Sequence, residues 1–449
     1  MSGDGAPKAI LARALAELRR AGAKEGTASI ASTREGFLRF AVNAPTTSGE
    51  VERRSLSVSA AIEGSKHSSA SGEDLSNEGI ARLAEQVVAT AKLAPPDPEY
   101  VPPAGSQKYA SIPWAYDPAT AEGDPARRAH SVKIVLDAAS EAGLIAAGLL
   151  SQSSHEVSFA ASTGASGATR STRAELSTTV RRPDGSSSGF AGAATIRIAD
   201  LDPLRIAQKA VDRAKAWVNP TALPPGKYTV VLEDVALAPL FGFIAMALDA
   251  RAAEEGRSCF ARPGGGTQVG QALFSPRVTI VSDPLDKVVP GAPWGEGNLA
   301  SQRHVYVEQG VLKSLRRSRY WARKTNTTPT ITGGSIKLAG GGKSSDQLVA
   351  GCERGLLVTN IWYVRMLNPK NLTVTGLTRD ASFLIENGKV TRPVKNFRFN
   401  QSLLAMLHDV EDAGPEKLSL SGGFGESIGF ALPPIRVKEF QMSSLSEAV

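Results

Sequence analysis

SFLIENGKVTRPV, residues 382–394, is the clearest β-hairpin signal in the chain. Asn387 and Gly388 can both adopt the positive φ that a type I′ turn requires, and apolar or β-branched residues stand on either side of them. Glu308–Gln309–Gly310 is a similar step earlier in the chain. Short β-branched runs accompany both, at residues 277–283, 304–315, 355–364 and 371–378. We therefore predict a β-rich, barrel-like second half with antiparallel strands.

One nearly apolar segment, Val235–Leu248, stands among these strands. It contains a proline, and it is shorter than the ~20 residues that a membrane span needs. We predict a long buried helix that extends to about residue 255. Upstream, the proline-rich segment NPTALPPG at 219–226 marks a change in composition and predicts a linker. The predicted domains are residues 1–219 and 226–449.

The first half of the chain shows helix signals separated by β-like sequence. Four helix starts are recognisable: a proline in the first turn at Pro7, a cap at Ser76, and Asp-Pro pairs at 124–125 and 202–203. The β-like sequence lies between the first and second starts and again between the third and fourth. The order helix, strands, helix thus occurs twice, which indicates an internal structural repeat. We predict an α+β fold whose N-terminal antiparallel sheet is flanked by helices.

The composition is that of a globular chain without a strong bias toward one class of partner. The 449 residues include 51 Lys and Arg against 44 Asp and Glu, and the net charge of +7 is spread along the chain. This charge raises the expectation of nucleic-acid binding only slightly above that for an average chain, and we do not predict a nucleic-acid partner. The N-terminus lacks the pattern of a secretory signal, and the two cysteines, Cys259 and Cys352, are too few for a disulfide framework. We expect a cytoplasmic protein without membrane attachment.

Two short motifs resemble functional sequences but lack the required context. Gly425–Gly429 matches G-x-S-x-G, yet two prolines and no histidine follow it, so Ser427 is the only candidate nucleophile of a self-sufficient hydrolase. Gly340–Ser344 resembles the end of a phosphate loop but lacks its first glycine. The five histidines show no HExxH-type pairing. We predict a turn and a mobile loop at the two motifs, and neither catalytic nor metal-binding residues in this chain.

A basic stretch that contains aromatic residues lies at 313–324. Such a stretch can contact phosphates, but it is more often a solvated face or a subunit contact. Arg, Tyr and Trp are enriched at the energetic centres of protein interfaces. We therefore predict a subunit interface that involves Arg316, Arg319, Tyr320 and Trp321.

Several segments of the second half, in order and spacing, resemble the TldD/PmbA (TldD/TldE) family, also called modulators of DNA gyrase. They are EEGRSCF (254–260), QVGQ (268–271), GLLVTNIWYV (355–364) and LTVTGLTRDASFLIENGKVTRPVKNFRF (372–399). The order of helices and strands in the first half also fits this family, so the resemblance covers essentially the whole chain. It implies a zinc peptidase complex built from two related subunits.

The resemblance also implies which of the two subunits this chain is. The catalytic subunit carries HExxxH on the long helix of its second domain and a cysteine near its C-terminus. Here Phe241, Gly242 and Met246 occupy the positions of the first His, the Glu and the second His, and residues 416–437 contain no cysteine. We expect all three residues to belong to an apolar packing helix, with Met246 buried.

By this resemblance the chain is a non-catalytic subunit that acts on peptides or small unfolded proteins with a TldD-like homologue, and zinc is expected in that partner. Main-chain pairing with an extended peptide is a recognition mode that accepts many sequences. We predict it for a strand formed by Leu357, Val358, Thr359 and Asn360. Two alternatives stay open: a nucleic-acid or gyrase-associated binding protein, and the self-sufficient hydrolase.

Overall fold

The first half of the chain forms one long antiparallel sheet. The computed structural model describes residues 5–420 and 429–446, and in this part the sheet has six strands in the order β3-β2-β1-β4-β5-β6. β1 and β4 lie side by side in its middle, and β3 and β6 are its edges. The strands are β1 Glu25–Ala41, β2 Ala44–Ala61, β3 His67–Gly72, β4 Ile145–Ala161, β5 Ser166–Arg181 and β6 Ser188–Thr195.

Four helices of the first half begin close to where the sequence predicts. Ser76, Asp124 and Asp202 each accept a hydrogen bond from a backbone N–H in the first turn that follows. These bonds satisfy donors that a helix start leaves without a partner. A short fifth helix, capped by Asp117, was not expected. The helices are α1 Gly5–Ala21, α2 Asn77–Leu93, α3 Pro118–Glu122, α4 Pro125–Glu141 and α5 Pro203–Ala216.

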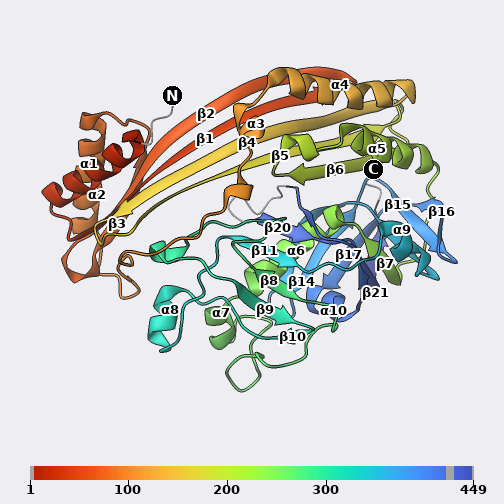
Figure 1. Cartoon of the computed structure of the whole chain (residues 1–449). Helices are drawn as coiled ribbons and strands as arrows, with labels where there is room; N and C mark the ends of the chain where they lie inside the picture. Colours follow the sequence, from red (N-terminus) through yellow and green to blue (C-terminus); the bar gives the residue numbers. More distant parts are fainter. Residues whose placement is uncertain (1–4, 421–428, 447–449) are drawn as a thin grey trace.

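The first half contains the same order of elements twice, as the repeat predicts. One unit is α1-β1-β2-β3-α2 and the other is α4-β4-β5-β6-α5. Each unit has its own apolar core, which includes Leu11 and Val87 in the first unit and Leu150 and Val211 in the second. Figure 1 shows α1 and α2 at one end of the sheet and α4 and α5 at the other. The predicted α+β class with an N-terminal antiparallel sheet is confirmed.

The second half contains two further sheets. Among the described residues, one has nine strands in the order β13-β14-β17-β21-β7-β12-β15-β16, with β18 paired to β21, and it curls into half a barrel. Its strands are β7 Gly226–Leu232, β12 Arg354–Val358, β13 Ile361–Asn368, β14 Thr373–Thr378, β15 Ser382–Glu386, β16 Lys389–Val394, β17 Phe397–Ser402, β18 Val410–Ala413 and β21 Ile435–Leu445.

The smaller sheet of the second half has the order β10-β9-β8-β11-β20-β19. Its strands are β8 Ile280–Ser282, β9 His304–Glu308, β10 Val311–Leu312, β11 Ser335–Leu338, β19 Lys417–Leu418 and β20 Gly429–Leu432. The helices of this half are α6 Asp234–Ala247, α7 Ala250–Glu254, α8 Arg319–Lys324, α9 Ser345–Ala350 and α10 Leu403–His408.

Both hairpin turns read from the sequence are present. Asn387 and Gly388 have φ of 51° and 71° and join β15 to β16. Gln309 and Gly310 have φ of 47° and 82° and join β9 to β10. Positive φ at both central residues is what a type I′ turn needs. Local turn chemistry that the sequence displays thus explains these two antiparallel pairs, whereas β7 with β12 and β11 with β20 pair in parallel.

The long helix predicted to extend to about residue 255 is divided in two. α6 ends at Ala247, and α7 begins after a break at Leu248 and Asp249. Asp249 has extended φ and ψ, and its Oδ1 accepts a hydrogen bond of 2.7 Å from the Ala252 N–H. A capping side chain of this kind starts a new helix, which explains why the single helix was wrong.

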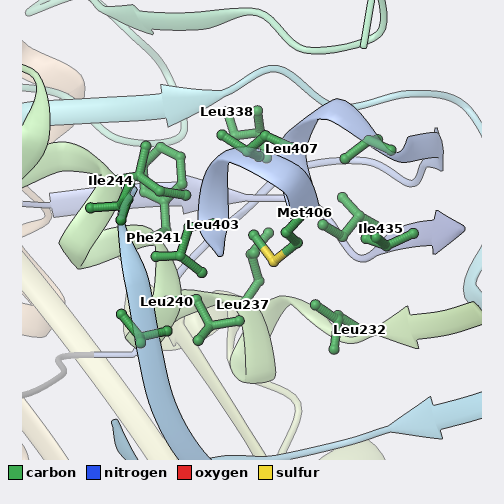
Figure 2. Close-up of a cluster of buried hydrophobic side chains, with 14 of the residues drawn as sticks. Leu232, Leu237, Leu240, Phe241, Ile244, Leu338, Leu403, Met406, Leu407 and Ile435 are labelled. Atoms are coloured by element: carbon green, nitrogen blue, oxygen red, sulfur yellow. The ribbon is translucent and has the colours of Figure 1, made fainter. Parts of the chain in front are cut away.

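α6 lies in the core of the second half. Figure 2 shows its Leu237, Leu240, Phe241 and Ile244 packed among side chains of α10, β11 and β21. The burial predicted for this helix is thus correct for most of its length. Within the described part of the chain, no helix combines the length and the apolar character needed to cross a membrane.

The two halves are joined by direct side-chain contacts. Trp294 of the second half packs on Phe159 of β4, with ring centroids 4.8 Å apart. Arg251 of α7 donates hydrogen bonds of 2.8 and 2.9 Å to the carboxylate of Glu99. Figure 1 shows the long sheet arching over the second half.

Candidate functional site

The three positions that the resemblance aligns with HExxxH lie on α6 in different environments. Phe241 is fully buried, and its ring meets that of Phe430 edge-on at a centroid distance of 5.4 Å. Gly242 is buried beside it. Met246, in contrast, is 56% exposed, so the expectation that it is buried was wrong. Five residues along an α-helix correspond to a rotation of about 140°, which turns Met246 away from the face that holds Phe241.

These three residues do not fit a zinc ion. Zinc in proteins is bound by imidazole nitrogen, thiolate sulfur or carboxylate oxygen, and Phe, Gly and Met supply none of these groups. In residues 5–420 and 429–446, no three His, Cys, Asp or Glu side chains gather in a way that could hold a metal. Both cysteines are buried free thiols, and burial raises the pKa of Cys259 to about 11. That the isolated chain binds no zinc stays a prediction.

A cavity of about 890 Å³ lies between the two halves of the chain. Its walls come from β6 and α5 on one side and from α6, α9, β16, β19 and Leu357 of β12 on the other. Glu233, directly before α6, is buried in this wall and accepts hydrogen bonds from Lys209 at 2.8 Å and from Arg213. Burial alone would raise the pKa of Glu233, but the two cations hold it at about 2.

The neighbouring carboxyl group of Asp234 behaves differently. Burial raises its pKa, and Lys417, at 3.8 Å, opposes this effect only in part. The cavity thus contains one carboxylate fixed in its ionised form by Lys209 and Arg213 and a second that burial biases toward protonation. This cluster was not predicted from the sequence. Lys209 and Arg213 lie one turn apart on α5, but nothing local shows that their partner is in the other half of the chain.

The segment predicted to pair with a peptide belongs largely to an interior strand. Leu357 and Val358 are part of β12, which pairs with β7 along one edge and with β15 along the other. Because both edges are occupied, main-chain pairing with a peptide at these residues was a wrong prediction. Thr359 and Asn360 donate hydrogen bonds of 3.0 and 3.1 Å to the carbonyl and the carboxylate of Asp380.

The predicted interface segment is divided between the surface and the core. Arg316 is exposed, and Arg319 and Tyr320 are half-buried. Trp321 is only 6% exposed and lies in the core of the second half, where its Nε1 donates to Glu254 at 2.5 Å. Trp321 therefore packs α8 onto the core of its own chain. The prediction that Trp321 belongs to a subunit interface was wrong. The interface role of the other three residues stays a prediction.

β13, an edge of the nine-stranded sheet, presents aromatic side chains to solvent instead. Trp362 and Tyr363 are 52% and 55% exposed. The guanidinium of Arg379 lies 4.5 Å from the Trp362 ring centroid, and that of Arg365 lies 4.4 Å from the Tyr363 ring centroid. Tyr363 has a φ of 57°, within a bulge of the strand. In the sequence these aromatic residues stand out only as part of the segment that resembles the family.

The two short motifs that resemble functional sequences are Gly340–Ser344 and Gly425–Gly429. The described residues of the first do not form a phosphate-binding loop. The Gly340 N–H donates to a carboxylate of the chain itself, Glu416, at 3.0 Å, and Ser344 caps the six-residue helix α9. Glu416 thus takes the backbone donor that a phosphate oxygen would need in a phosphate loop. Residues 425–428 of the G-x-S-x-G match, with Ser427, lie outside the described residues.

Three solved structures share the fold of this chain. TldE from Thermococcus kodakarensis gives a TM-score of 0.85 at 18% identity and covers 96% of this chain and 99% of that one. A candidate modulator of a DNA gyrase from Thermotoga maritima gives 0.82 at 18% identity, with coverages of 97% and 99%. A second such protein, from Bacteroides thetaiotaomicron, gives 0.83 at 21% identity, with coverages of 99% and 100%. No curated protein sequence matches the chain.

Family models identify the sequence more specifically. The PmbA/TldA metallopeptidase central domain matches residues 120–216, which hold α4 to α5 and the second repeat unit. The PmbA/TldA metallopeptidase C-terminal domain matches residues 225–444, which hold α6, the half-barrel and the β13 edge. Together the two models cover most of the chain. The chain therefore belongs to the TldD/PmbA metallopeptidase family.

Proposed function

We propose that the chain is the non-catalytic subunit of a TldD/TldE-type metallopeptidase complex that processes peptides or small unfolded proteins. The observation that carries the proposal is Phe241, fully buried where the family's catalytic subunits have their first zinc-binding His. Its ring packs edge-on against Phe430, so this part of α6 offers neither a ligand nor space for an ion. Family membership supports peptide hydrolysis as the chemistry of the complex.

In this proposal the zinc ion and the general base belong to a TldD-like homologue. The residues of this chain shape the enclosed space and contact the substrate and the partner. A cytosolic location, which the sequence predicts from its two cysteines and the absence of a secretory pattern, is part of the same proposal.

We assign the docking of the homologue to the β13 edge, the surface formed by Trp362, Tyr363, Arg365 and Leu367. Among the described residues no strand pairs with the edge of β13 away from β14, and Leu367 is exposed as well as the two aromatic rings. Trp, Tyr and Arg are the residue types that dominate binding energy in interfaces. The bulge at Tyr363 interrupts the row of main-chain hydrogen-bonding groups along this edge. Non-specific pairing with another strand is therefore disfavoured, and a partner with a complementary surface is favoured.

Co-expression with a homologue that retains HExxxH tests the proposed function. We expect a stable complex in size-exclusion chromatography with light scattering, and peptide cleavage that a chelator abolishes and zinc restores. The control is the homologue with Gln in place of the Glu of HExxxH, which should assemble without cleaving. Chelator-sensitive cleavage by this chain alone, or no association with the homologue, would contradict the proposal.

The open alternative of a nucleic-acid or gyrase-associated protein predicts a different result. Binding through phosphate contacts weakens steeply as salt concentration rises. Titration of the chain with duplex DNA at several salt concentrations separates the two functions. We expect no saturable, salt-dependent binding, because the net charge of +7 is spread over 449 residues.

A further inference from the structure

The cavity between the two halves has an excess of positive charge around the start of α6. Lys209 and Arg213 of α5 share one carboxylate, that of Glu233. Lys417 of β19 is the third cation of this wall, and Asp234 is the second carboxylate. In the described part of the chain, no other carboxylate forms an ion pair with these three cations. Because burial also biases Asp234 toward its neutral form, at least one cation lacks an anion.

Two of these cations retain hydrogen-bond donors that a ligand can use. An ammonium group carries three N–H donors. The Nζ of Lys417 lies 3.8 Å from a carboxylate oxygen of Asp234, which is beyond hydrogen-bonding distance. Lys209 donates one hydrogen bond, of 2.8 Å, to Glu233. Both lysines line the cavity, so their remaining donors are available to an anionic group inside it.

The other charged side chains of the lining lie at exposed positions. They are Asp200, Asp202, Arg205, Asp346 and Lys389. Asp200 is paired with Arg197 outside the lining, and Asp202 caps α5. Water and salt screen charges at exposed positions. The preference of the cavity for one sign of charge is therefore decided at the start of α6, where Glu233 and Arg213 are buried.

The other walls of the cavity are largely apolar. They include Ile206 of α5, Val349 of α9, Leu357 of β12, Leu418 of β19 and the small residues of β6. The volume of about 890 Å³ is within the range of small-molecule sites, which combine apolar walls with a few polar groups. The cavity thus suits a ligand with an apolar body and one acidic group.

We propose that this cavity is a binding site for a small organic acid, whose acidic group lies beside Lys209 and Lys417 and whose apolar body lies between the two halves. A neutral molecule of the same shape would leave the excess cation without an anion. A nucleotide would bring more negative charge than the excess can balance. The inference concerns this chain alone and does not depend on the homologue, on zinc or on peptide cleavage.

A pair of fluorescent probes that differ in one charge tests the ligand class on the isolated full chain. 8-Anilinonaphthalene-1-sulfonate is an apolar body with one acidic group, and N-phenyl-1-naphthylamine is the same body without it. We expect saturable binding of the sulfonate, and binding of the neutral probe weaker by about tenfold or more. Decanoate and naphthalene-2-carboxylate should displace the sulfonate, whereas decan-1-ol should not. The stronger of the two displacers distinguishes an aliphatic from an aromatic acid as the ligand.

Substitution of Lys417 tests the location. Its side chain is 52% exposed, so Lys417→Met removes the charge without disturbing the core. We expect this variant to bind the sulfonate about tenfold more weakly, with the affinity for the neutral probe and the melting temperature unchanged. Lys417→Arg should retain binding. Lys227→Met is the matched control, because Lys227 is an exposed lysine whose ion pair with Glu439 lies outside the cavity lining.

A second variant tests the apolar part of the site. Val390 of β16 lines the cavity and is 45% exposed, so Val390→Trp fills space in it. We expect weaker binding of both probes at an unchanged melting temperature. Three outcomes would overturn the inference: no saturable binding of the sulfonate, equal affinity for the two probes, or sulfonate binding that both Lys417→Met and Val390→Trp leave unchanged.

Discussion

Phe241 and Met246 lie on the same helix but should differ sharply in their tolerance of histidine. Phe241→His removes a buried ring from its contact with Phe430 and buries a polar one, at a cost of about 3 kcal/mol in the free energy of unfolding. Met246→His changes an exposed side chain and should cost about 0.5 kcal/mol or less. Urea unfolding of both variants measures these costs.

The same two variants test the absence of zinc. Neither creates a set of three ligands, since the remaining HExxxH positions stay unchanged. We expect elemental analysis after dialysis to find no stoichiometric zinc in the wild-type chain, in Phe241→His or in Met246→His. One tightly held zinc ion per wild-type chain would contradict the non-catalytic assignment.

Glu233 should make the stability of the chain depend on pH. Its pKa is lowered from 4.5 to about 2, so the ionised carboxylate stabilises the fold. That contribution is fully present above pH 4.5 and is lost as the pH falls through 2. Glu233→Gln leaves Arg213 and Lys209 without their anion and should cost on the order of 3 kcal/mol at pH 7. The difference from wild type should shrink as the pH falls toward 2.

Denaturant unfolding at a series of pH values between 7 and 3 measures the effect of Glu233→Gln. Glu439→Gln is the matched control, because Glu439 forms an exposed ion pair with Lys227 at 2.6 Å. We expect that control to change stability little at any pH. A Glu233→Gln cost that stayed constant down to pH 3 would show that the carboxylate is not held ionised by its two cations.

At the scale of elements, the break between α6 and α7 depends on one capping residue. Asp249 accepts from the Ala252 N–H at 2.7 Å, in a part of the chain where Ala250 and Arg316 are also joined by a backbone hydrogen bond of 2.9 Å. Asp249→Ala should lower the free energy of unfolding by about 1 kcal/mol, while Asp249→Ser should preserve most of it. Equal losses in the two variants, measured by thermal unfolding, would assign the effect to something other than the cap.

What the sequence could predict of these elements depends on the distance over which each signal acts. The caps at Ser76 and Asp202 and the turn at Asn387 and Gly388 were predictable, since residues within one turn determine them. The neighbours of β12 were not, because β7 lies more than a hundred residues upstream. The Glu233 cluster and the cavity were missed for the same reason. Both arise from pairing between distant segments, which leaves no local periodicity in the sequence.

At the scale of the whole molecule, two surfaces are candidates for binding the homologue: the β13 edge and the segment with Arg316 and Arg319. Variants at each surface decide between them. Trp362→Ala with Tyr363→Ala removes two exposed rings from the β13 edge, together with their stacking on Arg379 and Arg365. We expect this double variant to fold as stably as wild type and to bind the homologue weaker by about 2 kcal/mol or more, with peptide cleavage falling in parallel. Arg316→Ala with Arg319→Ala is the matched control in the segment that the sequence favoured.

Trp321→Ala should instead lower the free energy of unfolding by about 3 kcal/mol, because it leaves a hole in the core and Glu254 without one donor. Analytical ultracentrifugation with the homologue, beside thermal unfolding of each variant alone, distinguishes these effects. If the double arginine variant lost assembly and the β13 variant kept it, the homologue would dock at α8, and the exposed aromatic rings of β13 would need a different partner.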